Sequence, residues 1–255
     1  MAIKYIKEGS GTGTGTLADP YFFSQIATAE VAAGSGGTLY FTDGTYDNVG
    51  TWDESGLTYE SLNLHGALIT GTAVTLGSAS NSITFKKFKV RPDATELIYI
   101  YGATTLVDQI DHAVASSQCI RVYTDGAKLT NSLILNDMTS GAIIMRDADL
   151  FSEITGCTIF IKGLNGKSAD AVNFHSGNPD NMKNCIFTSD DTANNVVNSA
   201  ATLATNSTNC CFFQFGTGNA SGGTDNKFAD PLFVTAPTDL RLRPGSPCIN
   251  AGTTS

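Results

Sequence analysis

Paired carboxylates are the residues of this chain whose types and spacing best fit hydrolytic chemistry. Hydrolysis of a glycosidic bond needs two carboxyl groups, held either about 5 to 5.5 Å or about 6.5 to 9.5 Å apart. The candidate pairs are Asp53 with Glu54, Asp108 with Asp111, Asp147 with Asp149, and Asp190 with Asp191. Neighbouring residues of a strand point to opposite faces, so Asp190 and Asp191 can share a site only in a loop. Solvated turn aspartates are the ordinary alternative.

Three histidines are present, His65, His112 and His175. His112 follows Asp111, a sequence that suits acid–base chemistry, but it falls where we expect an inward side chain. A buried neutral histidine bonded to the backbone is therefore the alternative interpretation. We name Asp190, Asp191, Asp111 and His112 as the candidate catalytic residues.

No established cofactor or metal motif occurs in the chain. A Gly-x-Ser-x-Gly elbow, a Walker loop and a dinucleotide fingerprint are all missing. The six cysteines include no C-x-x-C pair, which argues against zinc or thioredoxin-type chemistry. We expect no cofactor and no metal, with the cysteines as buried, reduced thiols. Whether the protein is an enzyme stays open, and a non-enzymatic role is favoured.

Composition limits the partners. Charged residues make up 15% of the 255 positions, and the formal net charge is -9. A polyanion repels phosphate backbones and anionic lipid surfaces, so we expect neither nucleic acid nor membrane as a partner. No apolar run approaches the roughly 20 residues of a membrane span. The N-terminus shows no apolar core of a secretory signal, although a natural signal could have been removed.

A repeat of drifting length indicates which elements hold these residues. A short apolar pattern recurs every 22 to 28 residues. Its middle positions are Leu62, Phe88, Ile110, Ser132, Cys157, Cys185 and Cys210. Helix-pair repeats need about 33 to 47 residues, which is longer than this unit. Second apolar stretches lie between the middle positions, so each unit holds at least two short strands, as in a chain wound into coils roughly 4.8 Å apart.

Stacked coils place equivalent residues in internal columns. One predicted column is small, consisting of Ser132, Cys157, Cys185 and Cys210, and its neighbour is large, consisting of Ile134, Ile159, Phe187 and Phe212. A β-sandwich is the alternative. It would need hairpin turns between paired strands, and neither Asp43-Gly44 nor Asp125-Gly126 lies between two equal strands.

Both ends of the chain are predicted to be caps. Asp19-Pro20 predicts a helix start, an apolar stripe of Phe22, Phe23, Ile26 and Val31 follows, and Gly34 ends the helix. A strand is predicted over 38–42. Residues 1–18, rich in Gly and Thr, are predicted to be a flexible arm, and 19–255 a single capped domain.

These ends resemble a known family. GTLADPYFFSQIATAEVAAGSGGTLYFTDGTY resembles the opening of right-handed parallel β-helix proteins of the pectate-lyase-like and phage-spike-like type. FADPLFVTAPTDLRLRPGSPCINAGT is similar to the segment that closes them, DPLF…LRPGSP…AG. The resemblance implies an all-β, single-stranded right-handed parallel β-helix, a solenoid with an N-terminal capping helix.

Enzymes with this fold use an outer groove, and the resemblance extends to them only in part. Asp190-Asp191 resembles a polygalacturonase aspartate pair, but the companion G-H-G and R-I-K segments are missing. Pectate lyases combine a calcium-binding carboxylate cluster with a catalytic arginine. No stacked acidic cluster is recognisable opposite Arg121 or Arg146.

Outward aromatic residues suggest a binding surface. Trp52, Tyr59, Tyr99, Tyr101 and Tyr123 include positions that could face solvent. Tyr99, Tyr101 and Tyr123 are expected to form a flat strip for a sugar or for a partner subunit.

Three functions follow as hypotheses. The favoured one is a non-enzymatic structural protein of a bacteriophage virion, as a capsid decoration or tail component that is made in the host cytoplasm without a signal peptide. Its expected partners are other virion proteins, bound through the N-terminal arm or an outer sheet face, with a homotrimer as one assembly. The second is a tailspike-like β-helix that binds or cleaves a polysaccharide, with a glycan as its partner. The third is a secreted bacterial surface protein, located outside the cell.

Overall fold

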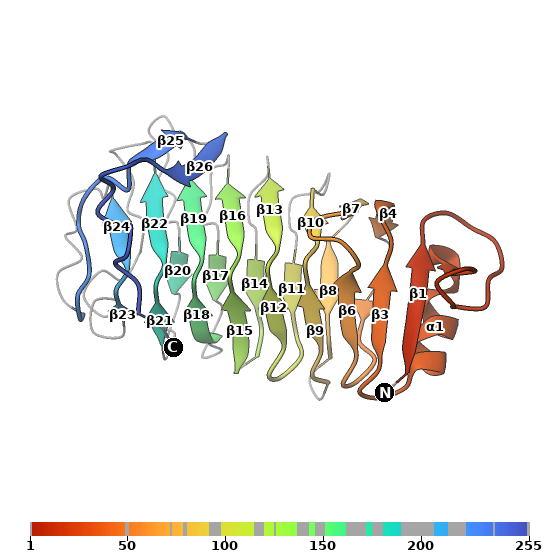
Figure 1. Cartoon of the computed structure of the whole chain (residues 1–255). Coiled ribbons are helices and arrows are strands. Elements are labelled where there is room, and N and C mark those ends of the chain that lie inside the picture. The colour runs from red at the N-terminus through yellow and green to blue at the C-terminus, as the bar shows by residue number, and fades with distance from the viewer. Residues whose placement is uncertain are drawn as a thin grey trace.

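The chain folds as an all-β parallel β-helix, seen along its side in Figure 1. The computed structural model describes residues 2–48, 51–71, 73–78, 81–91, 98–114, 120–124, 126–136, 143–145, 151–161, 172–174, 181–189, 207–213, 223–236 and 238–253. Three parallel sheets, called A, B and C here, run along the helix axis, and in the central coils successive strands belong to sheet A, sheet B and sheet C in turn, as β6, β7 and β8 do. The parallel pairing excludes the β-sandwich and confirms the predicted class.

The strand counts that follow are those of the described residues. Sheet A has ten strands: β2 (Tyr21–Phe22), β1 (Ile3–Lys7), β3 (Thr38–Phe41), β6 (Thr58–Ser61), β9 (Thr84–Lys86), β12 (Leu106–Asp108), β15 (Ala127–Thr130), β18 (Phe151–Thr155), β21 (Met182–Lys183) and β23 (Ser207–Thr208). Sheet B has eight: β4 (Gly44–Asn48), β7 (Ala67–Gly71), β10 (Lys89–Val90), β13 (Asp111–Val114), β16 (Leu133–Asn136), β19 (Thr158–Ile161), β22 (Ile186–Ser189) and β24 (Cys211–Phe213). Sheet C has six: β5 (Thr51–Trp52), β8 (Val74–Leu76), β11 (Ile98–Ile100), β14 (Ile120–Val122), β17 (Ile143–Met145) and β20 (Val172–Phe174).

The corner from sheet A to sheet B is tight and repeats from coil to coil. From the corner after β9 onward, one residue at each such corner has a left-handed backbone, with φ between 48° and 66°: Lys87, Gln109, Asn131, Gly156, Asn184 and Asn209. Asparagine and glycine tolerate this conformation better than most residues. The backbone N–H of each of these residues donates a hydrogen bond to a carbonyl of the following coil, for example Asn131 N to Thr155 O at 2.8 Å. The corner therefore carries the ladder of hydrogen bonds without a break.

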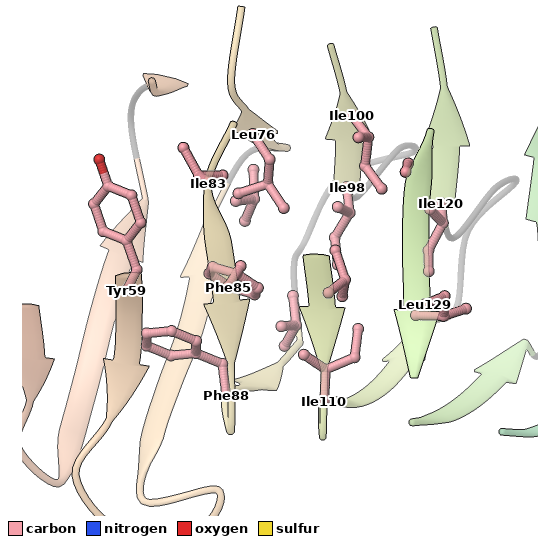
Figure 2. Packing of buried hydrophobic residues seen from close by; sticks show 14 of the residues in the cluster. Tyr59, Leu76, Ile83, Phe85, Phe88, Ile98, Ile100, Ile110, Ile120 and Leu129 are labelled. Carbon is pink, nitrogen blue, oxygen red and sulfur yellow. The ribbon is translucent and has the colours of Figure 1, made fainter. Parts of the chain in front are cut away.

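Both predicted internal columns are present. Ser132, Cys157, Cys185 and Cys210 are at most 3% exposed, and so are Ile134, Ile159, Phe187 and Phe212. The Phe187 and Phe212 rings stack with centroids 5.3 Å apart. Figure 2 shows the buried residues of the N-terminal half packing in the same way, coil on coil.

The repeat was misassigned in one coil. Leu62 is 38% exposed and Leu64 is 61% exposed. The corner after β6 is longer than the others, and Ser61 Oγ shapes it by donating to Asn63 O and accepting from Ala67 N. Ile69, in register with Val90, and Ala67, two residues earlier, therefore take the inward positions.

Trp52 and Tyr59 are core residues rather than surface aromatics. Their exposed fractions are 2% and 0%, and their rings lie 5.1 Å apart. Trp52 also stacks on Phe41, with centroids 5.3 Å apart and planes 9° apart. Alternation along a two-residue strand is too short a pattern to decide which side of β5 faces inward.

The N-terminal cap differs from its prediction in two respects. The helix starts later, as a 3-10 turn η1 (Phe23–Gln25) followed by α1 (Ile26–Ala33), and it ends at Gly34 as expected. Its buried residues are Ala29 and Ala33, whereas Val31 is 80% exposed. Ile3–Lys7, expected to lie in a flexible arm, forms β1 and pairs with β3. Ile6 of this segment is fully buried. By joining sheet A, the segment gains backbone hydrogen bonds along its length.

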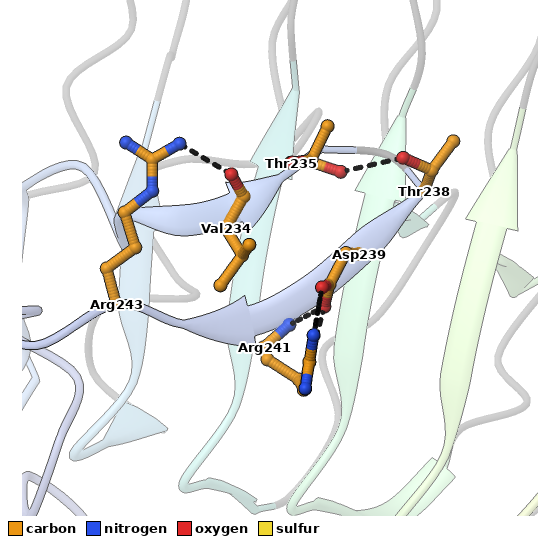
Figure 3. Close-up of polar contacts among 6 residues, drawn as sticks. All are labelled: Val234, Thr235, Thr238, Asp239, Arg241 and Arg243. Carbon is orange, nitrogen blue, oxygen red and sulfur yellow. Dashed lines mark hydrogen bonds and ion pairs between the residues drawn. The ribbon is translucent and has the colours of Figure 1, made fainter.

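The C-terminal segment folds back over the outer side of sheet B. It forms the antiparallel hairpin of β25 (Phe233–Thr235) and β26 (Asp239–Leu242), which crosses the strands at this end in Figure 1. Phe233 packs on Phe160, with centroids 6.3 Å apart. Figure 3 shows the polar contacts of the hairpin, including the Arg241–Asp239 ion pair.

Candidate functional site

The candidate site is the outer face of sheet C, where four side chains meet on two adjacent coils. Tyr99 and Arg121 are in register on β11 and β14. Tyr101 and Tyr123 directly follow these strands, and Tyr123 N donates to Ile100 O, which continues the ladder. Inward residues of both strands, such as Ile100 and Val122, are fully buried. The alternation of the strands thus directs Tyr99 and Arg121 away from the core.

The three tyrosines gather as predicted, but as a stack rather than a flat strip. The Tyr101 and Tyr123 rings are 4.4 Å apart at their centroids, and their planes differ by 5°. Coplanar rings cannot approach so closely, so the rings lie face to face along the axis, at nearly the spacing of the coils. Tyr99 lies beside both, at 6.2 and 6.0 Å.

Arg121 completes this cluster, which we call the tyrosine–arginine cluster (Tyr99, Tyr101, Arg121 and Tyr123). Its guanidinium carbon is 5.1 Å from the centroid of Tyr123, a cation–π contact. Arg121 is only 8% exposed, whereas Tyr101 is 38% exposed. Gly77 follows β8 where Tyr101 follows β11, so that position carries no side chain over the ring. Tyr101 is therefore the accessible ring of the cluster.

Two of the predicted carboxylates have separate partners. Asp108, at the end of β12, accepts hydrogen bonds from Thr130 Oγ1 at 2.6 Å, Asn131 Nδ2 at 2.9 Å and Gln109 Nε2 at 2.8 Å. Asp111 lies at the start of β13 in sheet B. Both of its carboxylate oxygens accept hydrogen bonds from one guanidinium nitrogen of Arg91, at 2.8 and 2.9 Å. Asp108 thus stabilises the corner between sheets A and B, and Asp111 forms an ion pair on the outer face of sheet B.

The remaining candidates divide between the described and the undescribed parts of the chain. Asp190, Asp191, Asp147, Asp149, Arg146 and His175 lie outside the described residues. The backbone of His112 pairs with Val90 and Ile134, but its side chain is not described. The catalytic predictions for these residues stay predictions.

An acidic group that the sequence did not single out lies in the N-terminal cap. Glu30 on α1 accepts a hydrogen bond from the Tyr59 hydroxyl at 2.9 Å. Burial raises the pKa of Glu30, and the nearby charges of Asp53 and Glu54 raise it further, against the lowering effect of the Tyr59 bond. Burial also raises the pKa of Tyr59 well above its usual range. The signal was hidden because Glu30 and Tyr59 are 29 positions apart.

Metal ligands do not converge in the part of the chain that the structure describes: no group of three His, Cys, Asp or Glu side chains gathers there. No described helix is long and apolar enough to cross a membrane.

Comparison with known proteins establishes the fold and leaves the family open. No family model matches the chain, and neither does any curated protein sequence. Among solved structures, pectin methylesterase PemA from Erwinia chrysanthemi superposes with a TM-score of 0.60 at 11% identity, covering 94% of this chain and 93% of that one. Pectate lyase Pel9A superposes with a TM-score of 0.55 at 12% identity, covering 100% and 92%. The fold is that of the parallel β-helix proteins. At this identity the likeness extends to the backbone path and no further.

Proposed function

We propose that this protein binds a polysaccharide on the outer face of sheet C, with Tyr101 as the main stacking residue. The observation that carries the proposal is the tyrosine–arginine cluster: the exposed Tyr101 ring is backed by the parallel ring of Tyr123, which in turn contacts the Arg121 guanidinium. A sugar has apolar C–H faces and polar edges, and an aromatic ring with nearby donors matches both. Three phenolic hydroxyls and Thr75, in register with Tyr99, supply polar groups beside the ring.

The shape of the face suits a linear polymer. Sheet C repeats its outward positions with every coil, roughly 4.8 Å along the axis. A chain of sugars can follow this direction and contact several coils, so that weak contacts add up. The support of the rings also matters, because a pre-packed side chain loses little freedom when the ligand binds.

Charge favours a neutral polysaccharide. The formal net charge of -9 opposes the approach of a polyanion, and Arg121 is already largely buried against Tyr123. The two solved structures are named as a pectin methylesterase and a pectate lyase, which supports polysaccharides as the ligand class for this fold.

The alternative function is that of a tailspike-like enzyme that cleaves the bound polymer. Such cleavage would depend on carboxylates such as Asp190 and Asp191. A place in a bacteriophage virion is compatible with glycan binding, as for a tail component that touches a cell surface. It draws no support from the comparisons and stays a prediction, as do the secreted location, the homotrimer and the virion partners.

The test is affinity electrophoresis of the full chain in gels that contain a neutral glucan, a neutral galactan or polygalacturonate. We expect retardation in at least one neutral gel, a loss of affinity of about tenfold in Tyr101→Ala, and retention in Tyr101→Phe, which keeps the ring. Tyr40→Ala is the matched control, because Tyr40 stacks on Tyr5 at 5.7 Å on the outer face of sheet A. Equal binding by Tyr101→Ala and the wild type, or equal loss in Tyr40→Ala, would overturn the proposal.

A further inference from the structure

The C-terminal segment brings two thiols together that are 37 positions apart. Cys211 is on β24, and its neighbour Cys210 points into the interior column, so Cys211 points outward. Cys248 lies in the tail that returns along this side. Both cysteines line one cavity of about 140 Å³, together with Asn184, Lys227 and Gly252.

The tail is fixed at several points around this cavity. Asn184 Nδ2 donates to Thr253 O and Thr253 N donates to Asn184 Oδ1, both at 3.0 Å. Ser246 Oγ donates to Pro231 O at 2.6 Å and accepts from Cys248 N at 3.1 Å. Cys211 Sγ lies 3.2 Å from Ala229 O. Both cysteines are thus positioned by contacts other than the one between the two thiols.

We propose that Cys211 and Cys248 are a disulfide-forming pair that locks the C-terminal segment onto the last coil. Both side chains line the same small cavity, and each thiol is the strongest influence on the pKa of the other, so the two sulfur atoms need to cross only this shared space to form a bond. Cys211 is 3% exposed, whereas Cys248 is partly exposed. An oxidant from solution therefore meets Cys248 first.

The charges agree with this order of events. The hydrogen bond from Cys211 lowers the pKa of Cys248, and the same contact raises the pKa of Cys211. The thiolate is the reactive form, so Cys248 is the attacking group and Cys211 the resolving group.

The reaction balances with a small disulfide such as glutathione disulfide as oxidant. The Cys248 thiolate attacks one sulfur of glutathione disulfide, the S–S bond breaks, and one glutathione leaves as its thiolate and takes up a proton. Cys211 then loses its proton to solvent and attacks the Cys248 sulfur of the mixed disulfide, which releases the second glutathione. Two protein thiols are oxidised and one glutathione disulfide is reduced to two glutathione molecules.

The interior thiols provide a contrast within the same chain. Cys157, Cys185 and Cys210 form a column of thiols that donate hydrogen bonds to backbone carbonyls, for example Cys185 Sγ to Lys183 O at 3.1 Å. Burial raises the pKa of Cys185. The interaction of Cys210 with Cys185 raises the pKa of Cys210. All three are at most 1% exposed, so an oxidant is not expected to reach them and they should stay reduced.

The experiment oxidises the full, folded chain with glutathione disulfide, then unfolds it in guanidinium chloride with excess iodoacetamide, so that every remaining thiol is blocked, and measures the intact mass. We expect two protected thiols and no bound glutathione in the wild type. Cys211→Ala should stop at one glutathione bound to Cys248, and Cys248→Ala should leave Cys211 unmodified. Cys157→Ala and Cys210→Ala should still close the bond.

A second readout separates the lock from mere reactivity. The closed disulfide should raise the melting temperature by about 5 °C or more, and dithiothreitol should reverse this shift. A wild-type protein that gains only glutathione, or a disulfide that survives in Cys248→Ala, would overturn the proposal.

Discussion

The two ends of the β-helix are closed by different means. At the N-terminal end, β1 extends sheet A with four residue pairs to β3, and α1 covers the mouth with Ala29 and Ala33 buried. At the C-terminal end, the described residues continue the ladder with two isolated bridges, Thr208 with Thr224 and Cys211 with Lys227. Phe228 stacks on Phe212 of the last coil, with ring centroids 5.9 Å apart, and the hairpin of β25 and β26 then lies over the outer side of sheet B.

This difference separates two sources of stability. The N-terminal cap prolongs the backbone ladder and joins the continuous core, so its opening would break the same contacts that hold the coils together. In the described residues, the C-terminal cap is attached by backbone bonds of Thr224 and Lys227 to the last coil and, beyond these, by side-chain contacts such as Phe233 on Phe160 and Asn184 with Thr253. Segments with few buried apolar contacts open at lower free energy. We therefore expect the C-terminal cap to open first.

The largest expected effect lies at the N-terminal end. The ring centroid of Trp52 lies within 5.7 Å of the centroids of four other aromatic rings, which are those of Phe41, Tyr59, Phe85 and Phe88. Trp52→Ala leaves a cavity among them and should lower the free energy of unfolding by about 3 to 5 kcal/mol. Urea denaturation measures this loss. Tyr101→Ala, on the outer face, should cost far less; equal losses in the two variants would contradict the assignment of Trp52 to the core.

A smaller and more local effect is expected at the C-terminal end. Phe233→Ala removes the apolar contact of the hairpin with Phe160 and should cost about 2 kcal/mol. Hydrogen exchange should quicken in residues 233–253 and stay unchanged in β1 and β3. A rise in exchange over the whole chain would mean that the two caps open together, against the comparison made above.

The fold was largely predictable from sequence because stacking repeats the same demand in every coil. Small and large residues recur at equivalent positions, and Cys157, Cys185 and Cys210 are all found inside. The prediction failed where one coil breaks the rule. The corner that holds Leu62 is longer, and a pattern search cannot distinguish exposed leucines there from Ala67 and Ile69, which occupy the core positions.

The candidate site was only partly predictable. Tyr99, Tyr101 and Tyr123 were recognised because neighbouring coils carry them at equivalent positions. Their face-to-face stacking and the contact of Arg121 depend on rotamers, which sequence does not specify. Glu30 with Tyr59, and Cys211 with Cys248, were missed for another reason: each pair joins a cap to a coil, and caps lie outside the repeat.

The smallest effect tests the N-terminal cap through pH. Because the folded-state pKa of Glu30 is raised above 4.5, the folded protein binds its proton more tightly than the unfolded chain does. The stability linked to this proton is complete below pH 4.5 and is lost as pH rises through the raised pKa. Glu30→Gln keeps an oxygen acceptor for Tyr59 but carries no charge beside Asp53 and Glu54. Relative to the wild type, this variant should gain stability between pH 4 and pH 7 in urea denaturation, with little difference at the acidic end.

Glu153→Gln is the control with the opposite sign, because the Thr155 hydroxyl and Lys128 lower the pKa of Glu153. A pH-independent difference for Glu30→Gln would mean that the cap does not bury this carboxyl, and the contrast between the two ends would then rest on the β1 ladder alone.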